Sequence, residues 1–277
     1  MNPWWHSLWL LPLGFGVGAF GTLIGAGGGF LLVPILALVY RDMPPEALTS
    51  LSLAVVFFNT LSGSIAYGRR GRIDYRSGVQ FAAATVPGAI LGALATSYIP
   101  RRAFDGILGA VLVAAAAYLM ARPLRAHAGP SPDDPGVFCP TITDKSGRRY
   151  EYCYNRPLGI AISVGVGFLS SLLGIGGGIV HVPVLTGVLN FPVHVATATS
   201  HFVLSISALT GTLVHVAAGS FRRMGPERLV YLAVGVLAGA PLGAFLSERV
   251  RGAWILRGLA LGLAAVGVRL VASALGA

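Results

Sequence analysis

Long apolar runs alternate with short polar connections along almost the whole chain. The first run, residues 8–40, is uncharged and is interrupted near its middle by a glycine-rich segment, residues 25–29. A single straight helix over that run would be about 50 Å long, well beyond the ~30 Å hydrocarbon core of a bilayer. The pattern therefore predicts two half-length helices, 8–24 and 29–40. Further helices are predicted, in chain order, at 46–67, 77–98, 104–121, 158–173, 178–190, 195–216, 229–247 and 253–272.

The same pattern occurs twice in the chain. Residues 16–36 align without gaps on residues 165–185, and eleven of the 21 positions are identical. After a one-residue gap the match continues, for example between Pro44 and Pro192. We therefore predict an all-α integral membrane protein of about eight transmembrane segments in two repeats of four, with the first element of each repeat broken at its glycine run. The predicted division is a first transmembrane repeat at 1–121, an extramembrane linker at 122–157 and a second transmembrane repeat at 158–277.

Composition supports a membrane protein and narrows its chemistry. Hydrophobic residues make up 55% of the chain, charged residues only 11%, and the mean hydropathy is +0.74, whereas a soluble domain carries roughly 25% charged residues. The formal net charge is +10, but the arginines lie in short loops, as the positive-inside rule describes. We therefore expect a lipid bilayer as the surroundings and no nucleic-acid partner.

Several kinds of chemistry have no sequence support. Carboxylates stand only at the edges of the predicted spans, although carboxylates normally build cation sites and proton relays in membranes. The sequence also lacks a phosphate-binding GxxxxGK[ST] motif, an HExxH motif and metal-ligand spacing within the spans. We therefore predict that the protein is not an enzyme and has no catalytic residues, no metal and no cofactor.

The two glycine runs are the first candidates for a functional site. Where a helix restarts after glycines, its first N–H groups lack intrahelical partners and its dipole presents partial positive charge. Glycine also lets a ligand approach those groups closely, so the result is an anion site without a buried arginine. The alternative is that the glycines only permit tight helix packing. The candidate substrate-binding glycines are Gly27, Gly28 and Gly29 with Gly176, Gly177 and Gly178.

The spans that follow each glycine run are rich in hydroxyl and amide side chains, which can hydrogen-bond an oxyanion at membrane depth. Most serines and threonines in membrane helices bond their own backbone or a neighbouring helix instead. Asn59 is the most costly of these groups to bury, and Ser52, Ser200 and His201 are the next candidates for substrate binding. Titration of His201 or His181 would provide proton coupling, although a neutral histidine bonded inside the bundle is the commoner case.

Topology is open between two arrangements. If the arginine-rich loops 69–76 and 222–228 are both cytoplasmic, the repeats are parallel and each glycine run breaks a spanning helix. If each broken element is a re-entrant hairpin, each half crosses three times and the repeats are inverted, as in many transporters. Loop charge favours the first arrangement and places the linker in the cytoplasm.

The linker contains both cysteines and a predicted short hairpin. Residues 141–150 resemble two strands joined by a Ser-Gly turn. Cys139 and Cys153 flank this hairpin at a spacing that suits a disulfide. A cytoplasmic linker would instead keep them as thiols, so their redox state is left open.

The duplicated G-x-G-G-G segment followed by proline resembles the TauE/SafE-type sulfite exporter family. The motifs that carry the resemblance are GAGGGFLLVP and GIGGGIVHVP, and it covers about residues 8–121 and 158–272. The resemblance implies transport of small sulfur-containing anions such as sulfite, thiosulfate or organosulfonates (sulfoacetate). It does not choose among these anions, and the charged linker with its cysteines departs from the family pattern.

We therefore expect a multi-pass secondary carrier or facilitator of the cell inner (plasma) membrane. The anion would bind near the midplane between the two broken helices, and one half would move against the other. The alternatives are an anion channel that uses the glycines as a constriction, and a membrane scaffold that uses them only for helix packing. Transport direction, coupling ion and association into a homo-oligomer are left open.

Overall fold

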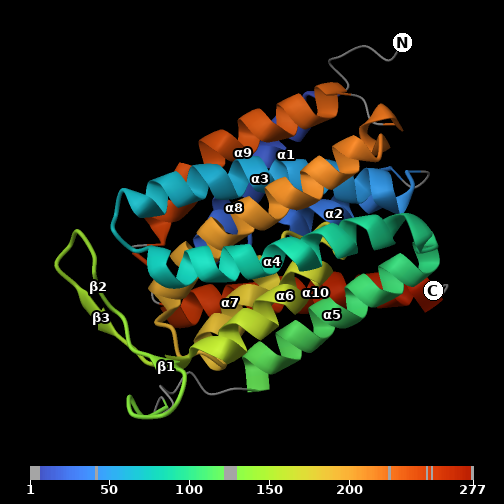
Figure 1. The fold of residues 1–277 in the computed structure, drawn as a ribbon. Helices are drawn as coiled ribbons and strands as arrows, with labels where there is room; N and C mark the ends of the chain where they lie inside the picture. Colours follow the sequence, from blue (N-terminus) through green and yellow to red (C-terminus); the bar gives the residue numbers. More distant parts are fainter. Residues whose placement is uncertain are drawn as a thin grey trace.

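The computed structural model of the chain describes residues 7–40, 43–121, 130–223, 226–247, 249–250 and 252–275. The fold is dominated by helices, which run roughly side by side in one bundle (Figure 1). The helices of the first half are α1 (Leu10–Ile24), α2 (Gly29–Val39), α3 (Pro45–Gly68), α4 (Tyr75–Ala95) and α5 (Arg101–Ala121). Those of the second half are α6 (Arg156–Leu173), α7 (Gly178–Gly187), α8 (Val193–Ala217), α9 (Pro226–Leu246) and α10 (Gly252–Leu275). In the described part of the chain, the short 3-10 helices η2 (Thr96–Tyr98) and η3 (Ser220–Arg223) lie between α-helices.

The helices match the requirements of a membrane environment. Within the described ranges, five helices are long and apolar enough to cross a bilayer: α3, α4 continued by η2, α6, α8 and α9. Shorter apolar helices accompany them, among them both helices of the first glycine break and α7 of the second. Many large apolar side chains are exposed on the outside of the bundle, for example Leu91 and Leu213. The fold is therefore that of an all-α, multi-pass membrane protein.

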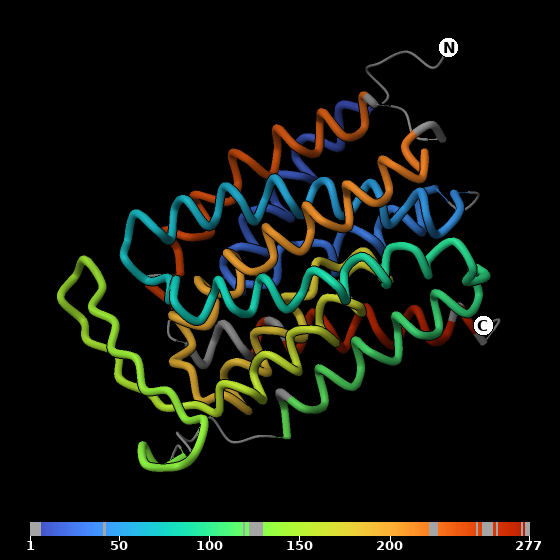
Figure 2. Tube along the Cα trace, in the orientation of Figure 1, coloured from blue at the N-terminus to red at the C-terminus, as the bar shows by residue number. Residues whose placement is uncertain are grey.

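Each glycine run reverses the direction of the chain. Leu10, at the start of α1, shares a buried cluster with Leu36 and Met43, at the end of α2 and just after it. In the same way Gly159, at the start of α6, approaches Leu189, just after α7. Figure 2 shows both pairs as hairpins that enter the bundle and return to the end from which they came. The interpretation that each glycine run breaks a spanning helix was therefore wrong.

The two halves have opposite orientations in the bundle. Gly63 of α3 lies against His201 of α8, and Gly211 lies against Leu53, so these two central helices run antiparallel. Arg228 lies over the ring of Tyr40, next to α2, while Arg72 contacts Asp144 of the linker at the other end. The arginine-rich loops of the two halves therefore lie at opposite ends, and the inference of a common cytoplasmic side fails for that reason.

Glycines let two pairs of helices approach to backbone contact. A methyl group at Gly239 or Gly243 of α9 would lie 2.2 and 2.1 Å from the carbonyl oxygens of Phe15 and Ala19 of α1. The symmetry-related pair is α4 with α6, where a methyl group at Gly88 would lie 2.0 Å from the carbonyl oxygen of Val164. Such close approach of small residues is the usual way of packing helices in a membrane. Each of these pairs joins one helix from each half.

The linker folds into strands at one end of the bundle (Figure 1). Strand β2 (Thr141–Thr143) pairs with β3 (Arg149–Glu151) as the predicted hairpin, and β1 (Val137–Phe138) pairs with β4 (Tyr154–Asn155). The hydroxyl group of Tyr152 donates a hydrogen bond of 2.8 Å to Asp74, the N-cap residue of α4. Burial and the Asp74 carboxylate raise the pKa of the Tyr152 phenol, so this donor stays neutral at ordinary pH and holds the linker against α4.

Cys139 and Cys153 are joined by a disulfide in this linker. Disulfides persist in oxidising compartments, so the bond favours an extracytoplasmic linker, opposite to the side that loop charge indicates.

Thiol labelling tests this disulfide. We expect a maleimide-polymer reagent to shift the denatured protein on a gel only after reduction. The variant Cys139→Ser should expose Cys153 to the reagent without reductant. Labelling of the wild type without reductant would show free thiols and would support the cytoplasmic placement.

Candidate functional site

The tips of the two hairpins meet inside the bundle. Each turn contains three glycines with positive φ, at +67° to +87°: Gly25, Gly27 and Gly28 in the first turn, and Gly174, Gly176 and Gly177 in the second. Only glycine adopts that backbone region without strain. A methyl group at Gly29 would lie 2.6 Å from the carbonyl oxygen of Ile175, and one at Gly178 would lie 2.5 Å from Cα of Ala26. The structure therefore shows the two tips in direct backbone contact.

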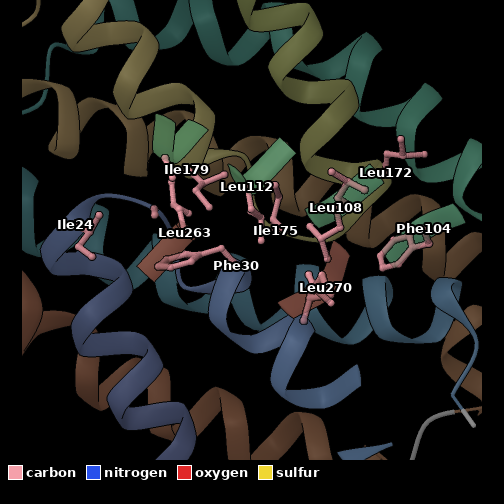
Figure 3. Close-up of a cluster of buried hydrophobic side chains, with 14 residues drawn as sticks. Ile24, Phe30, Phe104, Leu108, Leu112, Leu172, Ile175, Ile179, Leu263 and Leu270 are labelled. Atoms are coloured by element: carbon pink, nitrogen blue, oxygen red, sulfur yellow. The ribbon is translucent and has the colours of Figure 1, made fainter. Parts of the chain in front are cut away.

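The tips rest on an apolar base formed by the last helix of each half. Phe30 at the first tip and Ile175 and Ile179 at the second belong to one buried cluster with Leu112 of α5 and Leu263 of α10. Figure 3 shows these side chains gathered where the hairpins approach one another. The opposite side of each tip faces α3 and α8, which carry the polar side chains. The glycine runs thus lie between an apolar support and a polar wall.

Each tip presents backbone donors at a helix N-terminus. Gly28 is the N-cap residue of α2, and the N–H groups of Gly28, Gly29 and Phe30 donate no hydrogen bond within the described part of the chain. At α7, whose N-cap is Gly177, the N–H groups of Gly177 and Ile179 are likewise without an acceptor among the described residues. All of these residues are buried. Unpaired N–H groups at helix N-termini favour negative charge, as the sequence predicted for the glycine runs.

Ser52 and Ser200 are brought to the tips, where they bind backbone carbonyl groups. The Ser52 hydroxyl group donates a hydrogen bond of 2.6 Å to the carbonyl oxygen of Gly174, and that of Ser200 donates one of 3.3 Å to the carbonyl oxygen of Gly25. These two contacts are equivalent under the repeat. Each central helix therefore holds the hairpin of the other half by a hydrogen bond. In this structure, with the two tips in contact, the two hydroxyl groups stabilise the fold.

Asn59 and His201 belong to one buried polar chain. The Asn59 amide donates a hydrogen bond of 2.9 Å to the carbonyl oxygen of Gly27 and accepts one of 3.1 Å from the Thr22 hydroxyl group. The Thr22 oxygen lies 3.3 Å from Nε2 of His201, so it accepts from an Nε2–H tautomer. The Tyr67 hydroxyl group donates to the carbonyl oxygen of Thr22 at 2.7 Å. Thr22 is therefore the residue that joins the two predicted ones, and the prediction omitted it.

The corresponding residues of the second half have no such bonds. The repeat aligns Thr22 with Ser171 and Asn59 with Ser207, and the hydroxyl groups of Ser171 and Ser207 are buried and have no hydrogen-bond partner among the described residues. The Ser170 hydroxyl group likewise has no partner in the described part of the chain, and it lies 3.0 Å from the position of a methyl group on Gly177. Buried polar atoms are normally paired, so unpaired hydroxyl groups beside a helix N-terminus indicate donors that are available to a ligand.

His181 is the other histidine near the second tip. It lies in the first turn of α7 and is 1% exposed, and neither of its ring nitrogens has a hydrogen-bond partner among the residues that the structure describes. Its ring meets that of Phe81 edge-on.

The repeat could have indicated two of the unpaired serines from the sequence alone, because Ser171 and Ser207 occupy the positions that Thr22 and Asn59 occupy in the first half. Ser170 gave no such signal, because its counterpart is Gly21.

The tips offer hydrogen-bond donors. The donors there are backbone N–H groups and hydroxyl groups, which suit oxygen atoms of an anion. Among the described residues no cluster of three histidine, cysteine or carboxylate side chains could hold a metal ion. Of the described carboxylates, Asp74 and Asp105 stand at the N-terminal ends of α4 and α5, away from the tips.

Comparison with known proteins supports a transport role. The model of the family described as sulfite exporter TauE/SafE matches residues 10–270. A probable membrane transporter protein, YunE of Bacillus subtilis, is 33% identical over 273 residues, which are 95% of this chain and 96% of the relative. A probable membrane transporter protein of Methanocaldococcus jannaschii is 28% identical over 259 residues, 88% of each chain. No solved structure matches significantly.

Proposed function

The chain belongs to the sulfite exporter TauE/SafE family, and from that premise we propose that it carries small sulfur-containing anions across the inner (plasma) membrane. The substrates we propose are sulfite, thiosulfate and organosulfonates such as sulfoacetate. The coarser statement, a membrane transporter of the TauE/SafE type, rests on the family and on relatives that are themselves named as probable membrane transporters. The finer one rests on the chemistry of the tips.

The observation that carries the proposal is that both tips present hydrogen-bond donors without an acceptor among the described residues. The N–H groups of Gly28 and Gly177 are buried and have no acceptor among the described residues, and serine hydroxyl groups that likewise have no partner there stand beside the second tip. A sulfonate or sulfite group offers three oxygen atoms to such donors, and the helix dipoles offset its charge. Because the tips touch in this structure, the anion binds when they part, between Gly27–Gly29 and Gly176–Gly178.

Inverted repeats with a hairpin in each half suit a carrier. Six helices, three in each half, would cross the membrane, and the two hairpins would enter it from opposite sides. Inverted repeats with substrate bound at discontinuous helices near the midplane are a recurring transporter design. This proposal has six spans (α3, α4, α5, α8, α9 and α10) and two hairpins, and so differs from the eight crossing segments expected from the apolar pattern.

A ligand panel tests the substrate class directly. We expect sulfite, thiosulfate and sulfoacetate to raise the unfolding temperature of the purified protein, because a ligand that binds only the folded state at 100 times its Kd adds about 2.7 kcal/mol. Taurine carries an ammonium group that the tips cannot satisfy, so its shift should be smaller. A protein that none of these anions stabilises, and that gives no anion flux in liposomes, would contradict the proposal. Single-channel currents would show that the pathway is a channel.

The unpaired serines permit a second test that separates binding from folding. We expect Ser170→Ala to leave the unfolding temperature unchanged or slightly raised without ligand, because no hydrogen bond is lost. The same variant should weaken binding of the stabilising anion by roughly tenfold, the loss of one hydrogen bond to a charged group. Both quantities can be measured by thermal shift over a ligand titration.

Ser163→Ala is the matched control for that test. Ser163 lies on the same helix, is 1% exposed, and bonds the carbonyl oxygen of Gly159 in its own helix. Its replacement should leave anion affinity at the wild-type value. Equal affinities for wild type and Ser170→Ala would remove Ser170 from the site.

A further inference from the structure

A basic pocket lies outside the membrane helices, between the linker hairpin and the connection of α3 to α4. The hairpin reaches the connection through the backbone, where the N–H group of Lys145 donates a 3.0 Å hydrogen bond to the carbonyl oxygen of Arg70. The space between the two segments is about 280 Å³ in volume. Its lining consists of Arg70, Arg72, Asp144, Lys145, Ser146 and Arg148. Four cationic side chains thus share the pocket with one carboxylate.

Arg72 is the buried member of this lining. Arg72 is 4% exposed, and its Nε atom lies 3.4 Å from Oδ2 of Asp144. Its Nη1 atom is buried and has no hydrogen-bond partner within the described ranges. A buried guanidinium group with an unpaired donor is costly. An acceptor in the adjoining pocket would complete its coordination, and a guanidinium fork matches an oxyanion in shape as well as in charge.

Both oxygens of Asp144 already accept hydrogen bonds from other donors. Oδ1 accepts from the Ser146 N–H and hydroxyl groups and from the Arg148 N–H group. Oδ2 accepts from Nε of Arg72 and from the Tyr150 hydroxyl group, each at 3.4 Å. Burial acts to raise the pKa of Asp144, but these hydrogen bonds and the Arg72 charge hold it below its ordinary value. The carboxylate is therefore ionised and organises the turn, and it leaves an excess of positive charge toward the pocket.

We propose that this pocket binds an oxyanion group of the phosphate, sulfate or sulfonate class at a second site, separate from the hairpin tips. Arg72 supplies the buried donor, and Lys145 and Arg148 supply exposed charge from the hairpin. The pocket lies beyond the C-terminal end of α3. Asn59, which contacts the first tip, lies nine residues before the last residue of α3, Gly68, which is about 13 Å along the helix axis. The oxyanion is either a free anion or the headgroup of an anionic lipid. Both carry a negatively charged oxyanion group, and a lipid headgroup lies at the membrane surface, where the pocket is found.

Binding to the full-length protein tests the proposal. Inorganic phosphate and sulfate are titrated calorimetrically into lipid-free protein in a neutral detergent, and phosphatidylglycerol retention is followed by native mass spectrometry. We expect the double variant Lys145→Ala/Arg148→Ala to weaken the bound species by about tenfold or more, because two charge-assisted contacts are lost. The unfolding temperature without ligand should stay unchanged, since both side chains are exposed.

Arg149→Ala is the matched control. Arg149 is on the same hairpin, has a side chain 67% exposed and pairs with Glu151, but it does not line the pocket. It should retain affinity within about twofold, since surface ion pairs contribute little. Equal weakening by Arg149→Ala would show general charge attraction and would overturn the site, as would equal binding by all variants.

The two arms also identify the source of the oxyanion. Phosphate or sulfate binding that the double variant loses supports a free anion. Phosphatidylglycerol retained by the wild type and lost by the double variant supports a lipid headgroup. Absence of both overturns the proposal, and because the tip residues are intact in these variants, that result leaves the transport proposal untouched.

Discussion

Alanine at Gly29 or Gly178 should abolish anion transport and destabilise the protein. Each glycine is the first residue of a half-helix, and a methyl group there would lie within 2.6 Å of backbone atoms of the opposite tip. Backbone cannot move aside as a flexible side chain can, so the two hairpins must shift apart. Overpacking of this kind costs about 1–3 kcal/mol. Flux of labelled sulfite into proteoliposomes and chemical unfolding in detergent measure the two effects.

The chain offers matched controls at Gly16 and Gly165. These two glycines correspond under the repeat and lie in the first helix of each hairpin, and a methyl group at either would meet nothing within 4 Å. Alanine there should leave flux unchanged and raise helix stability by up to about 1 kcal/mol. Full flux in Gly29→Ala and Gly178→Ala would show that contact between the tips is irrelevant to transport.

Replacing Asn59 by leucine should strongly destabilise the protein. The substitution removes the amide that bonds two buried groups. The carbonyl oxygen of Gly27 loses its bond from Asn59, and the Thr22 hydroxyl group loses its acceptor and keeps only the 3.3 Å contact with Nε2 of His201. Each unpaired group costs about 1–3 kcal/mol. We expect a loss of about 2–4 kcal/mol in the free energy of unfolding, together with loss of flux because the first tip is no longer held.

Thr60→Val is the control for that change. Thr60 is the next residue of α3, is fully buried, and bonds the carbonyl oxygen of Val56 in its own helix. Valine there should cost well under 1 kcal/mol. A double-mutant cycle of Asn59→Leu with Thr22→Val should give a coupling energy of about 0.5–3 kcal/mol. Additive effects would mean that the two residues act independently, against the observed hydrogen bond.

The helices of this protein could be located from sequence because the apolar runs are long and well punctuated. The predicted breaks at Gly25–Gly29 and Gly174–Gly178 coincide with the ends of α1 and α6 and the starts of α2 and α7. The direction of the chain after each break could not be predicted. A broken span and a hairpin have the same apolar pattern, and the choice depends on how the tip packs against the other half.

The unpaired backbone N–H groups of the candidate site were predicted from the sequence, whereas the side-chain contacts around them were predicted only in part. Helix restart after glycine is a local property, so the free N–H groups at Gly28 and Gly177 follow from sequence. Whether a hydroxyl group faces a ligand or a carbonyl group depends on distant neighbours. Ser52 lies opposite a carbonyl group 122 residues away, and its partner became visible only in the folded chain.

The close pairing of α1 with α9 and of α4 with α6 limits how the protein can move. Separation of the two halves as rigid bodies would pull apart backbones that pack without room for a methyl group at Gly88, Gly239 and Gly243. For the alternating access that we propose, the bodies that move against each other must therefore each contain helices from both halves: α1 moves with α9, and α6 moves with α4. The duplication would supply the symmetry of the proposed carrier, while each moving body would combine helices from both copies.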